Sequence, residues 1–189
     1  MSSLKNKCAL IYGSCTGKTE YLADSVLEKF SPFIELELIE VTSINAADLS
    51  AYQFLICGIP TWDFGELEYG WQDLYDKLDE VDMEDVAVAI FGLGDQRDYP
   101  ETYQDAMGIL YKKLVERGAR GSIGFTSIDG HEFDDSRAVI GDQFCGLALD
   151  EDNQDDLSDA RIHEWAQQVI GELKALSPDM LIGEEVQNS

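Results

Sequence analysis

The first thirty residues contain the feature that most limits what this chain can fold into. Residues 8–12 form an uninterrupted apolar run, as expected for a strand buried on both faces of a sheet. The run stops at a loop rich in glycine and hydroxyl side chains, residues 13–19, and a helical pattern follows until Pro32 ends it. A buried strand that leads through such a loop into a helix favours an α/β fold whose first helix N-terminus holds an anionic group.

Strand-like and helical patterns continue to alternate beyond this unit. Ile34, Leu36 and Leu38 alternate with two glutamates, which predicts an edge or half-exposed strand. Apolar runs follow at residues 52–57, 86–93, 122–126 and 144–149. Helical spacing covers residues 71–78, 103–118 and 158–173, and Ser158 is expected to cap the last of these helices. The alternation predicts an α/β protein with a parallel sheet covered by helices.

The length of the chain and its turn signals predict one domain followed by a tail. A chain of 189 residues suits a single domain, which we expect to span residues 1–176. Turn signals at Asp129-Gly130 and Gly141-Asp142 separate the last two apolar runs. We therefore predict a fifth strand that is interrupted by an insertion over residues 127–144. Residues 177–189 follow a Ser-Pro pair and are expected to form a weakly ordered tail.

Acidic side chains restrict the partners that the protein can have. The formal net charge of −25 argues against nucleic acid and anionic membrane surfaces, since both repel an acidic body. Residues 63–85 carry ten acids against one lysine, and residues 129–159 carry eleven against one arginine. Acidity that only keeps the protein soluble is the competing interpretation. The clustering favours a basic protein partner instead.

Hydropathy predicts the compartment of the protein, and cysteine spacing indicates whether it binds a metal. No apolar run approaches the ~20 residues that a membrane span needs, and residues 1–7 lack a signal-peptide core, so we expect an intracellular protein with no membrane insertion. The four cysteines lie far apart without a CxxC pair, which argues against a metal site. Buried thiols are expected, except that Cys15 follows the first strand near a helix N-terminus, where a lowered pKa would make it reactive.

The loop after the first strand has two competing interpretations. Gly17-Lys18-Thr19 is similar to the end of a P-loop, which would indicate a nucleotide-binding or phosphoryl-transfer enzyme. That motif requires a glycine at position 12, where this chain has Tyr12, and Gly13 comes one residue too late. The spacing therefore favours a cradle for a single phosphate, built from hydroxyl side chains and backbone amides.

Two further loops, residues 58–65 and 94–100, also follow predicted strands. The carboxyl ends of parallel strands meet at one edge of the sheet, so all three loops should meet there. One loop supplies Trp62 and the other Tyr99, and both rings lie where little core is available to bury them. A flat aromatic ligand could lie between the two rings while its phosphate reaches residues 14–19.

At these residues the chain resembles the flavodoxins, in particular the long-chain type. The family's phosphate loop is matched by residues 14–19, its Pro-Thr-Trp loop by residues 60–62, and its Gly-Asp-Gln-x-x-Tyr loop by residues 94–99. The insertion at residues 127–144 is similar to the long-chain feature. The resemblance implies a flavodoxin-like three-layer α/β/α fold, with five parallel strands in the order 2-1-3-4-5, and FMN bound without a covalent link.

The resemblance also implies the cofactor-binding residues. These are Ser14, Cys15, Thr16, Gly17, Lys18, Thr19, Pro60, Thr61, Trp62, Asp63, Phe64, Gly65, Leu93, Gly94, Asp95 and Tyr99. Trp62 and Tyr99 would flank the isoalloxazine, and the carbonyl of the Asp63-Phe64 peptide would accept a hydrogen bond from it in the semiquinone. Lys18 has a second interpretation as a flexible, solvated side chain. Two departures from the family pattern are Asp98, where glycine is common, and His131, where an aromatic residue is common.

The implied function is that of an electron carrier rather than an enzyme. The expected partners are basic-surfaced redox proteins, namely a flavodoxin/ferredoxin reductase and an electron acceptor. The protein is expected to be a monomer in the cytoplasm, or in an organelle stroma after import. Asp63, Asp95 and Asp98 would disfavour an added negative charge on the flavin, so the reduction potential should be low. No residue pattern indicates a catalytic acid, base or nucleophile, since both histidines lie away from the predicted strand ends.

Overall fold

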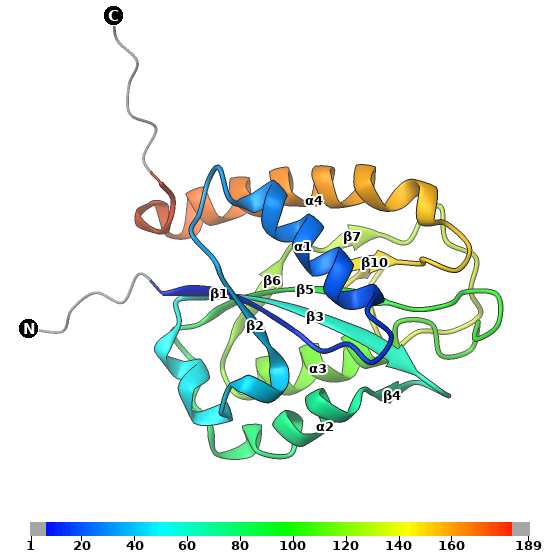
Figure 1. The fold of residues 1–189 in the computed structure, drawn as a ribbon, viewed down its shortest axis with the longest axis horizontal. Helices are drawn as coiled ribbons and strands as arrows, with labels where there is room; N and C mark the ends of the chain where they lie inside the picture. The colour runs from blue at the N-terminus through cyan, green and yellow to red at the C-terminus, as the bar shows by residue number, and fades with distance from the viewer. Residues whose placement is uncertain (1–6, 183–189) are drawn as a thin grey trace, which may run out of the picture.

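The computed structural model describes residues 7–182 as one α/β unit in which a central sheet lies between two layers of helices (Figure 1). The strands of the main sheet are β1 (Cys8–Tyr12), β2 (Glu37–Glu40), β3 (Phe54–Trp62), β4 (Glu66–Leu67), β5 (Ala87–Leu93), β6 (Arg120–Ile123) and β10 (Leu147–Leu149). The helices are α1 (Lys18–Phe30), α2 (Tyr69–Tyr75), α3 (Asp105–Glu116) and α4 (Asp155–Leu176). Short 3-10 turns lie at Val41–Ser43, Ala46–Ala51, Leu78–Glu80 and Pro178–Met180.

The order of the main strands confirms the predicted topology. Strands run β2-β1-β3-β5-β10 across the sheet, and these neighbours are all parallel. Strand β6 pairs with the first half of β5 and β10 with the second half. Together β6 and β10 form the interrupted fifth strand, so the predicted order 2-1-3-4-5 is correct. The short β4 is antiparallel to β3 and closes a hairpin with it.

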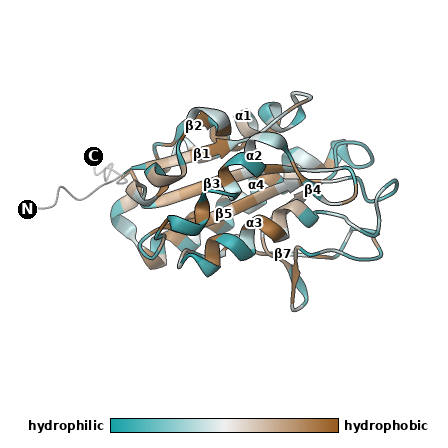
Figure 2. Ribbon diagram, turned by 90° about the horizontal axis from the view of Figure 1, so that it is seen from below, coloured by the Kyte–Doolittle hydropathy of each residue, from teal (hydrophilic) through white to brown (hydrophobic). Residues whose placement is uncertain are grey.

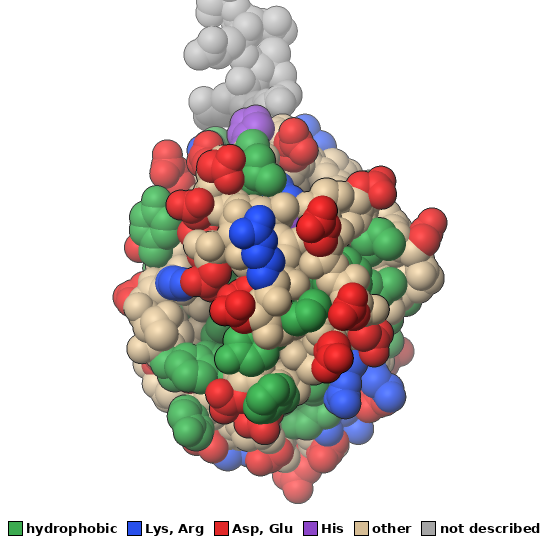
Figure 3. All heavy atoms as spheres, turned by 90° about the vertical axis from the view of Figure 1, so that its right-hand side faces the viewer, with side chains coloured by type: hydrophobic (Ala, Val, Ile, Leu, Met, Phe, Trp, Pro, Cys, Tyr) green, Lys and Arg blue, Asp and Glu red, His purple; other side chains and the backbone are tan. Residues whose placement is uncertain are grey.

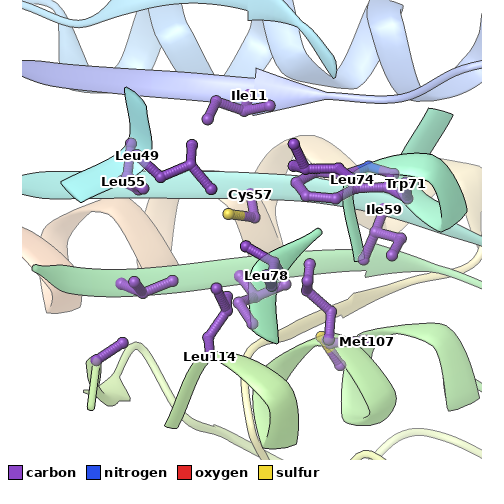
Figure 4. Close-up of a cluster of buried hydrophobic side chains, with 14 of the residues drawn as sticks. Ile11, Leu49, Leu55, Cys57, Ile59, Trp71, Leu74, Leu78, Met107 and Leu114 are labelled. Carbon is purple, nitrogen blue, oxygen red and sulfur yellow. The ribbon is translucent and has the colours of Figure 1, made fainter. Parts of the chain in front are cut away.

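Successive side chains of the buried strands serve two separate cores, because neighbouring residues of a strand point to opposite faces. Ala9 and Ile11 of β1 pack on the side of α2 and α3, whereas Cys8 and Leu10 pack on the side of α1 and α4. Figure 4 shows the first of these cores, with strand side chains directed toward Trp71, Met107 and the other labelled helix residues. Burial on both faces explains why these strands read as continuous apolar runs.

The insertion contains a small sheet of its own. Strands β7 (Thr126–Ser127), β9 (Gln143–Phe144) and β8 (Val139–Ile140) pair antiparallel in that order. The prediction that residues 122–126 and 144–149 are uniform pieces of the fifth strand was therefore wrong at Thr126 and Phe144. Phe144 is fully buried, because its ring fills the space between the small sheet and Tyr103. Its apolar character reflects this packing and not membership of the main sheet.

Three helix starts differ from the sequence prediction, and the smallest difference is that α2 begins at Tyr69 rather than at Trp71. Helix α4 begins at Asp155 rather than at Ser158, whose hydroxyl donates to the Glu151 carboxylate instead of capping the helix. Helix α3 begins at Asp105, so the buried Tyr103 precedes it. Ser158 thus lies within the first turn of α4, whereas Tyr103 lies in the loop before α3.

Residues 178–182 of the predicted tail pack against the body of the protein. Met180 and Leu181 contact the core beneath α1 and α4, and the Ile182 amide donates to the Phe33 carbonyl at 2.8 Å. These contacts place residues 180–182 against the body of the protein, within the segment for which the sequence suggests a weakly ordered tail. The remaining residues, 183–189, lie outside the described part of the chain. Every helix within residues 7–182 is too short or too polar to cross a membrane.

Candidate functional site

Loops from four strands meet at one edge of the sheet and line a single cleft. Leu93 at the end of β5 pairs with Pro60 on one side and Leu149 on the other, so these strands end at the same level. Their loops and the one after β1 gather at the right-hand end of the molecule in Figure 1, and Figure 2 shows that this end is largely hydrophilic. The cleft lies above β1 and β3, where the strand order reverses, as expected for an open α/β sheet.

Most of the predicted binding residues line this cleft. The lining residues among them are Cys15, Thr16, Lys18, Thr19, Pro60, Thr61, Trp62, Asp63, Leu93, Gly94, Asp95 and Tyr99. Ser14, Gly17, Phe64 and Gly65 do not line the cleft but shape the loops around it. The Ser14 hydroxyl accepts a hydrogen bond from the Gly17 amide at 3.0 Å, and the Gly65 amide donates to the Trp62 carbonyl at 3.1 Å. The three predicted loops therefore meet as the sequence indicates.

The loop after β1 presents the N-terminus of α1 to the cleft. Gly17 has a φ of 85°, a left-handed conformation that favours glycine, and it directs the chain into the helix. Within the described chain, no side chain caps the first turn of this helix. The first amides of α1 and the hydroxyls of Thr16 and Thr19 thus remain available to an anionic group in the cleft.

Two buried side chains, Glu68 at the start of α2 and Trp71 within it, support the loop after β1. The Glu68 carboxylate accepts hydrogen bonds from the amides of Gly70 and Trp71, at 3.1 and 3.3 Å, and caps α2. The Trp71 indole donates to the Gly58 carbonyl at 2.9 Å. Gly13 lies against both side chains, since a Cβ atom added there would come within 2.4 Å of the Glu68 carboxylate. Close packing of Gly13 on Glu68 and Trp71 fixes the position of the loop after β1.

The Cys15 thiol contacts the same carboxylate. Its Sγ lies 3.5 Å from Glu68 Oε1. Burial and this neighbouring carboxylate raise the pKa of the Cys15 thiol above its ordinary value, because both disfavour the thiolate. The prediction of a lowered pKa at this position was wrong, because burial and then the Glu68 carboxylate both favour the neutral thiol.

The hairpin between β3 and β4 carries the first aromatic ring. Trp62 ends β3, is half-buried and lines the cleft. Asp63 follows with a φ of 43°, a conformation that costs energy for a residue other than glycine. The next glycine, Gly65, has a φ of 93° and closes the turn. The Asp63-Phe64 peptide is thus part of a tight turn with an unusual backbone conformation.

The second ring comes from the loop after β5. Tyr99 lines the cleft with 40% of its surface exposed, and its amide donates to the Asp95 carbonyl at 3.1 Å. The Phe64 ring lies edge-on to Tyr99, with ring centroids 6.0 Å apart and an interplanar angle of 76°. The Asp95 side chain orders the same loop by accepting from the amides of Arg97 and Asp98, each at 3.0 Å. Burial opposes ionisation of Asp95, but these hydrogen bonds and that from Asn153 lower its pKa below the ordinary value.

A buried carboxylate joins this loop to the one that follows β10. Asp150 is fully buried and accepts hydrogen bonds from the amide and side chain of Gln96, at 3.1 and 2.8 Å. It also accepts from the amides of Asp152 and Asn153, at 3.1 and 3.0 Å, and from the Asn153 side chain. Hydrogen bonds from neutral N–H groups therefore satisfy this carboxylate, and it fixes two cleft loops to one another.

Four lining residues were not predicted from the sequence. They are Thr102, Tyr103, Glu151 and Asp152. Glu151 and Asp152 directly follow β10, so the strand-end rule that located the other loops could have located them. Tyr103 is fully buried and presents one side to the cleft. Its placement depends on the path of the chain between the loop and α3, for which the sequence holds no comparable pattern.

The charges around the cleft are mostly negative. Among the described residues that line it, Lys18 is the one cation, and its Nζ lies 2.5 Å from Asp152 Oδ1. The hydrogen bond to Asp152 raises the pKa of Lys18, so the amine is charged at neutral pH. Figure 3 looks onto this end of the molecule and shows carboxylate side chains spread across it. An anionic group in the cleft must therefore be held largely by N–H and O–H dipoles.

The arrangement has two chemically distinct ends. Hydroxyls, amides and Lys18 lie at one end, and the rings of Trp62 and Tyr99 at the other. This combination suits a ligand that carries both an anionic group and a flat aromatic system. The fold and the cleft define a doubly wound α/β protein that binds a ligand at its topological switch point.

Comparison with known proteins gives the family. A family model for flavodoxin matches residues 10–165. A flavodoxin of Nostoc sp. (strain PCC 7120 / SAG 25.82 / UTEX 2576) is 45% identical over 169 residues, which are 89% of this chain and 98% of that protein. Flavodoxin 2 of Escherichia coli (strain K12) is 42% identical, covering 87% of this chain and 95% of that protein. The chain belongs to the flavodoxin family, whose members are electron carriers and not enzymes.

The similarity extends to solved structures. The structure of Fusobacterium nucleatum flavodoxin bound to flavin mononucleotide matches with a TM-score of 0.82 and 28% identity, covering 88% of this chain and 98% of that one. Oxidised flavodoxin 1 of Bacillus cereus matches with a TM-score of 0.67 and 27% identity, covering 88% of this chain and 99% of that one. The flavodoxin-like fold predicted from the sequence is thus confirmed.

Proposed function

We propose that this chain carries single electrons on non-covalently bound FMN held in the cleft. The observation that carries the proposal is the juxtaposition, in one cleft, of an uncapped and hydroxyl-rich helix N-terminus with Trp62 and Tyr99. A phosphate monoester fits the first of these and an isoalloxazine fits the second. Bound FMN supplies the one-electron redox chemistry.

At the phosphate end, the chain offers dipoles in place of several cations. The amides at the start of α1 and the hydroxyls of Thr16 and Thr19 would hold the phosphate oxygens. Ser14 contributes indirectly, because its hydroxyl closes the loop on the Gly17 amide. Lys18 would add its charge only in part, since it is already paired with Asp152.

At the ring end, Trp62 and Tyr99 would flank the isoalloxazine and exclude water from its faces. The Asp63-Phe64 peptide lies in the turn next to Trp62 and is the backbone group that would accept a hydrogen bond from a ring nitrogen. Pro60, Thr61, Leu93 and Gly94 would line the edge between the two rings.

The carboxylates around the cleft explain why the carrier should work at low potential. Asp63, Asp95, Glu151 and Asp152 all line it. An electron added to the cofactor increases negative charge beside them, and Coulomb repulsion makes that addition less favourable. The same carboxylates would attract a basic reductase or acceptor, with association rates that fall as salt rises. A monomer that diffuses between such partners in the cytoplasm, or in an organelle stroma, fits this role.

The phosphoryl-transfer interpretation finds no support in the cleft. Position 12, where a P-loop has glycine, carries a tyrosine whose hydroxyl donates to Glu20 at 3.3 Å. The relatives and the solved structures named above are flavodoxins.

A redox titration of the purified protein tests the proposed function. The FMN-loaded protein should show flavin bands and take up electrons in two separate one-electron steps, the second at the more negative potential. A colourless protein that does not take up added FMN, or one that hydrolyses nucleoside triphosphates, would overturn the proposal.

A further inference from the structure

We propose that His131 takes up a proton from solvent when the cofactor in the cleft gains negative charge on reduction, with Tyr103 as the contact between the two. This inference rests on the proposed electron-carrier function, because it concerns the charge that a bound flavin acquires. His131 lies in the insertion and not in the cleft, so it is a positioning residue that acts through Tyr103.

The position of Tyr103 is the first observation. Its ring lines the cleft and lies against Gly94, where an added Cβ atom would come within 3.0 Å of Tyr103 Cδ2. Its hydroxyl lies 2.9 Å from His131 Nδ1. One phenol ring and one hydrogen bond therefore separate the cleft from the imidazole.

The hydrogen bond between these two residues depends on the charge of His131. When Nδ1 is the unprotonated nitrogen of a neutral imidazole, it accepts from the Tyr103 hydroxyl. An imidazolium carries a proton on both nitrogens, so its Nδ1 must donate to the Tyr103 oxygen. Burial raises the pKa of Tyr103 above its ordinary value, so the phenol keeps its proton in both cases. Protonation of His131 thus frees the Tyr103 O–H to turn toward an anion in the cleft.

The outer side of His131 is open to solvent. The residue is half-buried and borders two hollows, one between the insertion and α4 and the other beside Gln96 and Asn153. The Phe144 ring holds the imidazole edge-on, at a centroid distance of 5.2 Å. A proton can therefore reach His131 from water without passing through the cleft.

Charged groups of both signs surround His131. Burial and Arg161 lower its pKa to about 4, and Asp150 opposes them. A negative charge on the cofactor acts in the same direction as Asp150. For a charge about 10 Å away and an effective dielectric constant of about 20, the pKa of an imidazole rises by about one. The charged side chains that face His131 are the cations Arg97 and Arg161 and the acids Asp129, Glu132, Asp150 and Glu164.

The buried and hydrogen-bonded carboxylates near the cleft are less suited to accept this proton. Asp150 is fully buried and already accepts from the amides of Gln96 and Asp152. Asp95 accepts from two loop amides and from Asn153, and these hydrogen bonds lower its pKa. A proton on either carboxylate would leave N–H donors facing an O–H group.

The proposed step balances in electrons and protons. A protein redox partner gives one electron to the cofactor, and water gives one proton to the imidazole from its outer side. One N–H bond forms at His131, and no other bond of the protein changes. Reoxidation of the cofactor returns the electron to an acceptor and the proton to solvent.

NMR of the histidine side chains tests this step directly. The chain has two histidines, and His163 is exposed on α4. The FMN-loaded protein, labelled with ¹⁵N in its imidazoles, is measured in the oxidised and fully reduced forms. For a pKa of about 4 that rises by about one, the protonated fraction of His131 at pH 4.5 should increase from about one quarter to about three quarters. The titration midpoint of His163 should be the same in both forms.

The pH dependence of the potential gives the reciprocal measurement, because reduction and protonation must favour one another equally. Between pH 7 and pH 4.5, the potential of the second one-electron step should rise more in wild type than in His131→Gln. The expected difference is about three-fold in electron affinity, or about 30 mV. His163→Gln should match wild type throughout.

The outcomes separate this inference from the proposed function. A protonated fraction of His131 that is the same in oxidised and reduced protein would overturn the inference and leave the proposed function intact, even if the cofactor itself takes up a proton. Equal displacement of both histidine titrations would also overturn it, and so would parallel potential profiles for wild type and His131→Gln. A wild-type protein that binds no FMN would overturn the proposed function as well.

Discussion

The Tyr103 hydroxyl and the Nδ1 atom of His131 lie 2.9 Å apart, so a hydrogen bond connects the wall of the cleft to the insertion. Tyr103 is fully buried, and its ring also packs against Phe133 and Phe144. Two further hydrogen bonds join the insertion to the loop after β5. The Glu132 amide donates to the Gln96 side-chain oxygen, and the Asp134 amide donates to the Pro100 carbonyl. The insertion thus holds the loop that carries Tyr99.

Protonation of His131 should weaken the fold at low pH. Burial, and then the nearby Arg161, lower the pKa of His131 from 6.5 to about 4. Between these values the unfolded chain binds a proton that the folded chain does not, so the free energy of unfolding falls as pH falls through this window. His131 is partly exposed, which limits the effect to roughly 1–2 kcal/mol at the lower end.

Urea unfolding between pH 4 and pH 7 measures this contribution. We expect His131→Gln to lose part of the pH dependence of wild type, while His163→Gln, at an exposed position on α4, retains it. An unchanged slope in His131→Gln would show that the buried carboxylates, and not this imidazole, set the acid sensitivity.

Asp150→Asn should loosen two cleft loops at once. The substitution replaces an oxygen by an NH₂ group that would face N–H donors of Gln96 and Asn153. We expect a loss of about 2–3 kcal/mol in the free energy of unfolding and weaker FMN binding. Asp142→Asn, at an exposed turn of the insertion, is the control and should match wild type. Unchanged stability in Asp150→Asn would mean that the carboxylate charge is not needed for these hydrogen bonds.

Gly13→Ala should displace the phosphate loop. The added methyl group would lie 2.4 Å from Glu68 Oε2 and 2.6 Å from Trp71 Cδ1, and neither buried side chain has room to move. We expect at least a ten-fold weaker FMN affinity and a loss of about 1–3 kcal/mol in stability. Gly171→Ala, which has open space around it in α4, should be neutral or stabilising by up to about 1 kcal/mol. Fluorescence titration and thermal melts check both variants.

Asp98→Asn should raise the potential of the second one-electron step. Asp98 lies exposed on the Tyr99 loop, and removing its charge relieves repulsion at the cleft. Coulomb's law for a charge about 10 Å away in water gives a shift on the order of 20 mV. Spectroelectrochemistry at low salt measures it, with Asp24→Asn on α1 as the control. A fall in the potential would rule out an electrostatic role for Asp98.

The sequence predicts the main sheet and the meeting of three loops because both follow from local patterns. Continuous apolar runs identify strands buried on both faces, and the carboxyl ends of parallel strands must share an edge. Trp62, Tyr99 and the loop at residues 14–19 therefore came together as expected. The tight turn at Gly17 before α1 also follows from the sequence, because glycine adopts such a backbone conformation readily.

Features that depend on distant contacts were not predictable in this way. The strands of the small sheet are two residues long, too short for periodicity to reveal. The raised pKa of Cys15 comes from burial and from Glu68, which is 53 positions away, and neither can be inferred from the residues next to Cys15. Tyr103 and Phe144 read as ordinary apolar residues, although they connect the cleft to the insertion.

The central claim is that one cleft holds both the phosphate and the ring system of FMN. Titration of the apoprotein with FMN and with riboflavin, followed by flavin fluorescence, tests it most directly. We predict quenching at one FMN per chain, weaker binding of riboflavin, which lacks the phosphate, and weaker binding of both flavins by Trp62→Ala. Equal affinity for the two flavins would contradict the role of the loop at residues 14–19, and a wild-type chain that quenches neither would contradict the account as a whole.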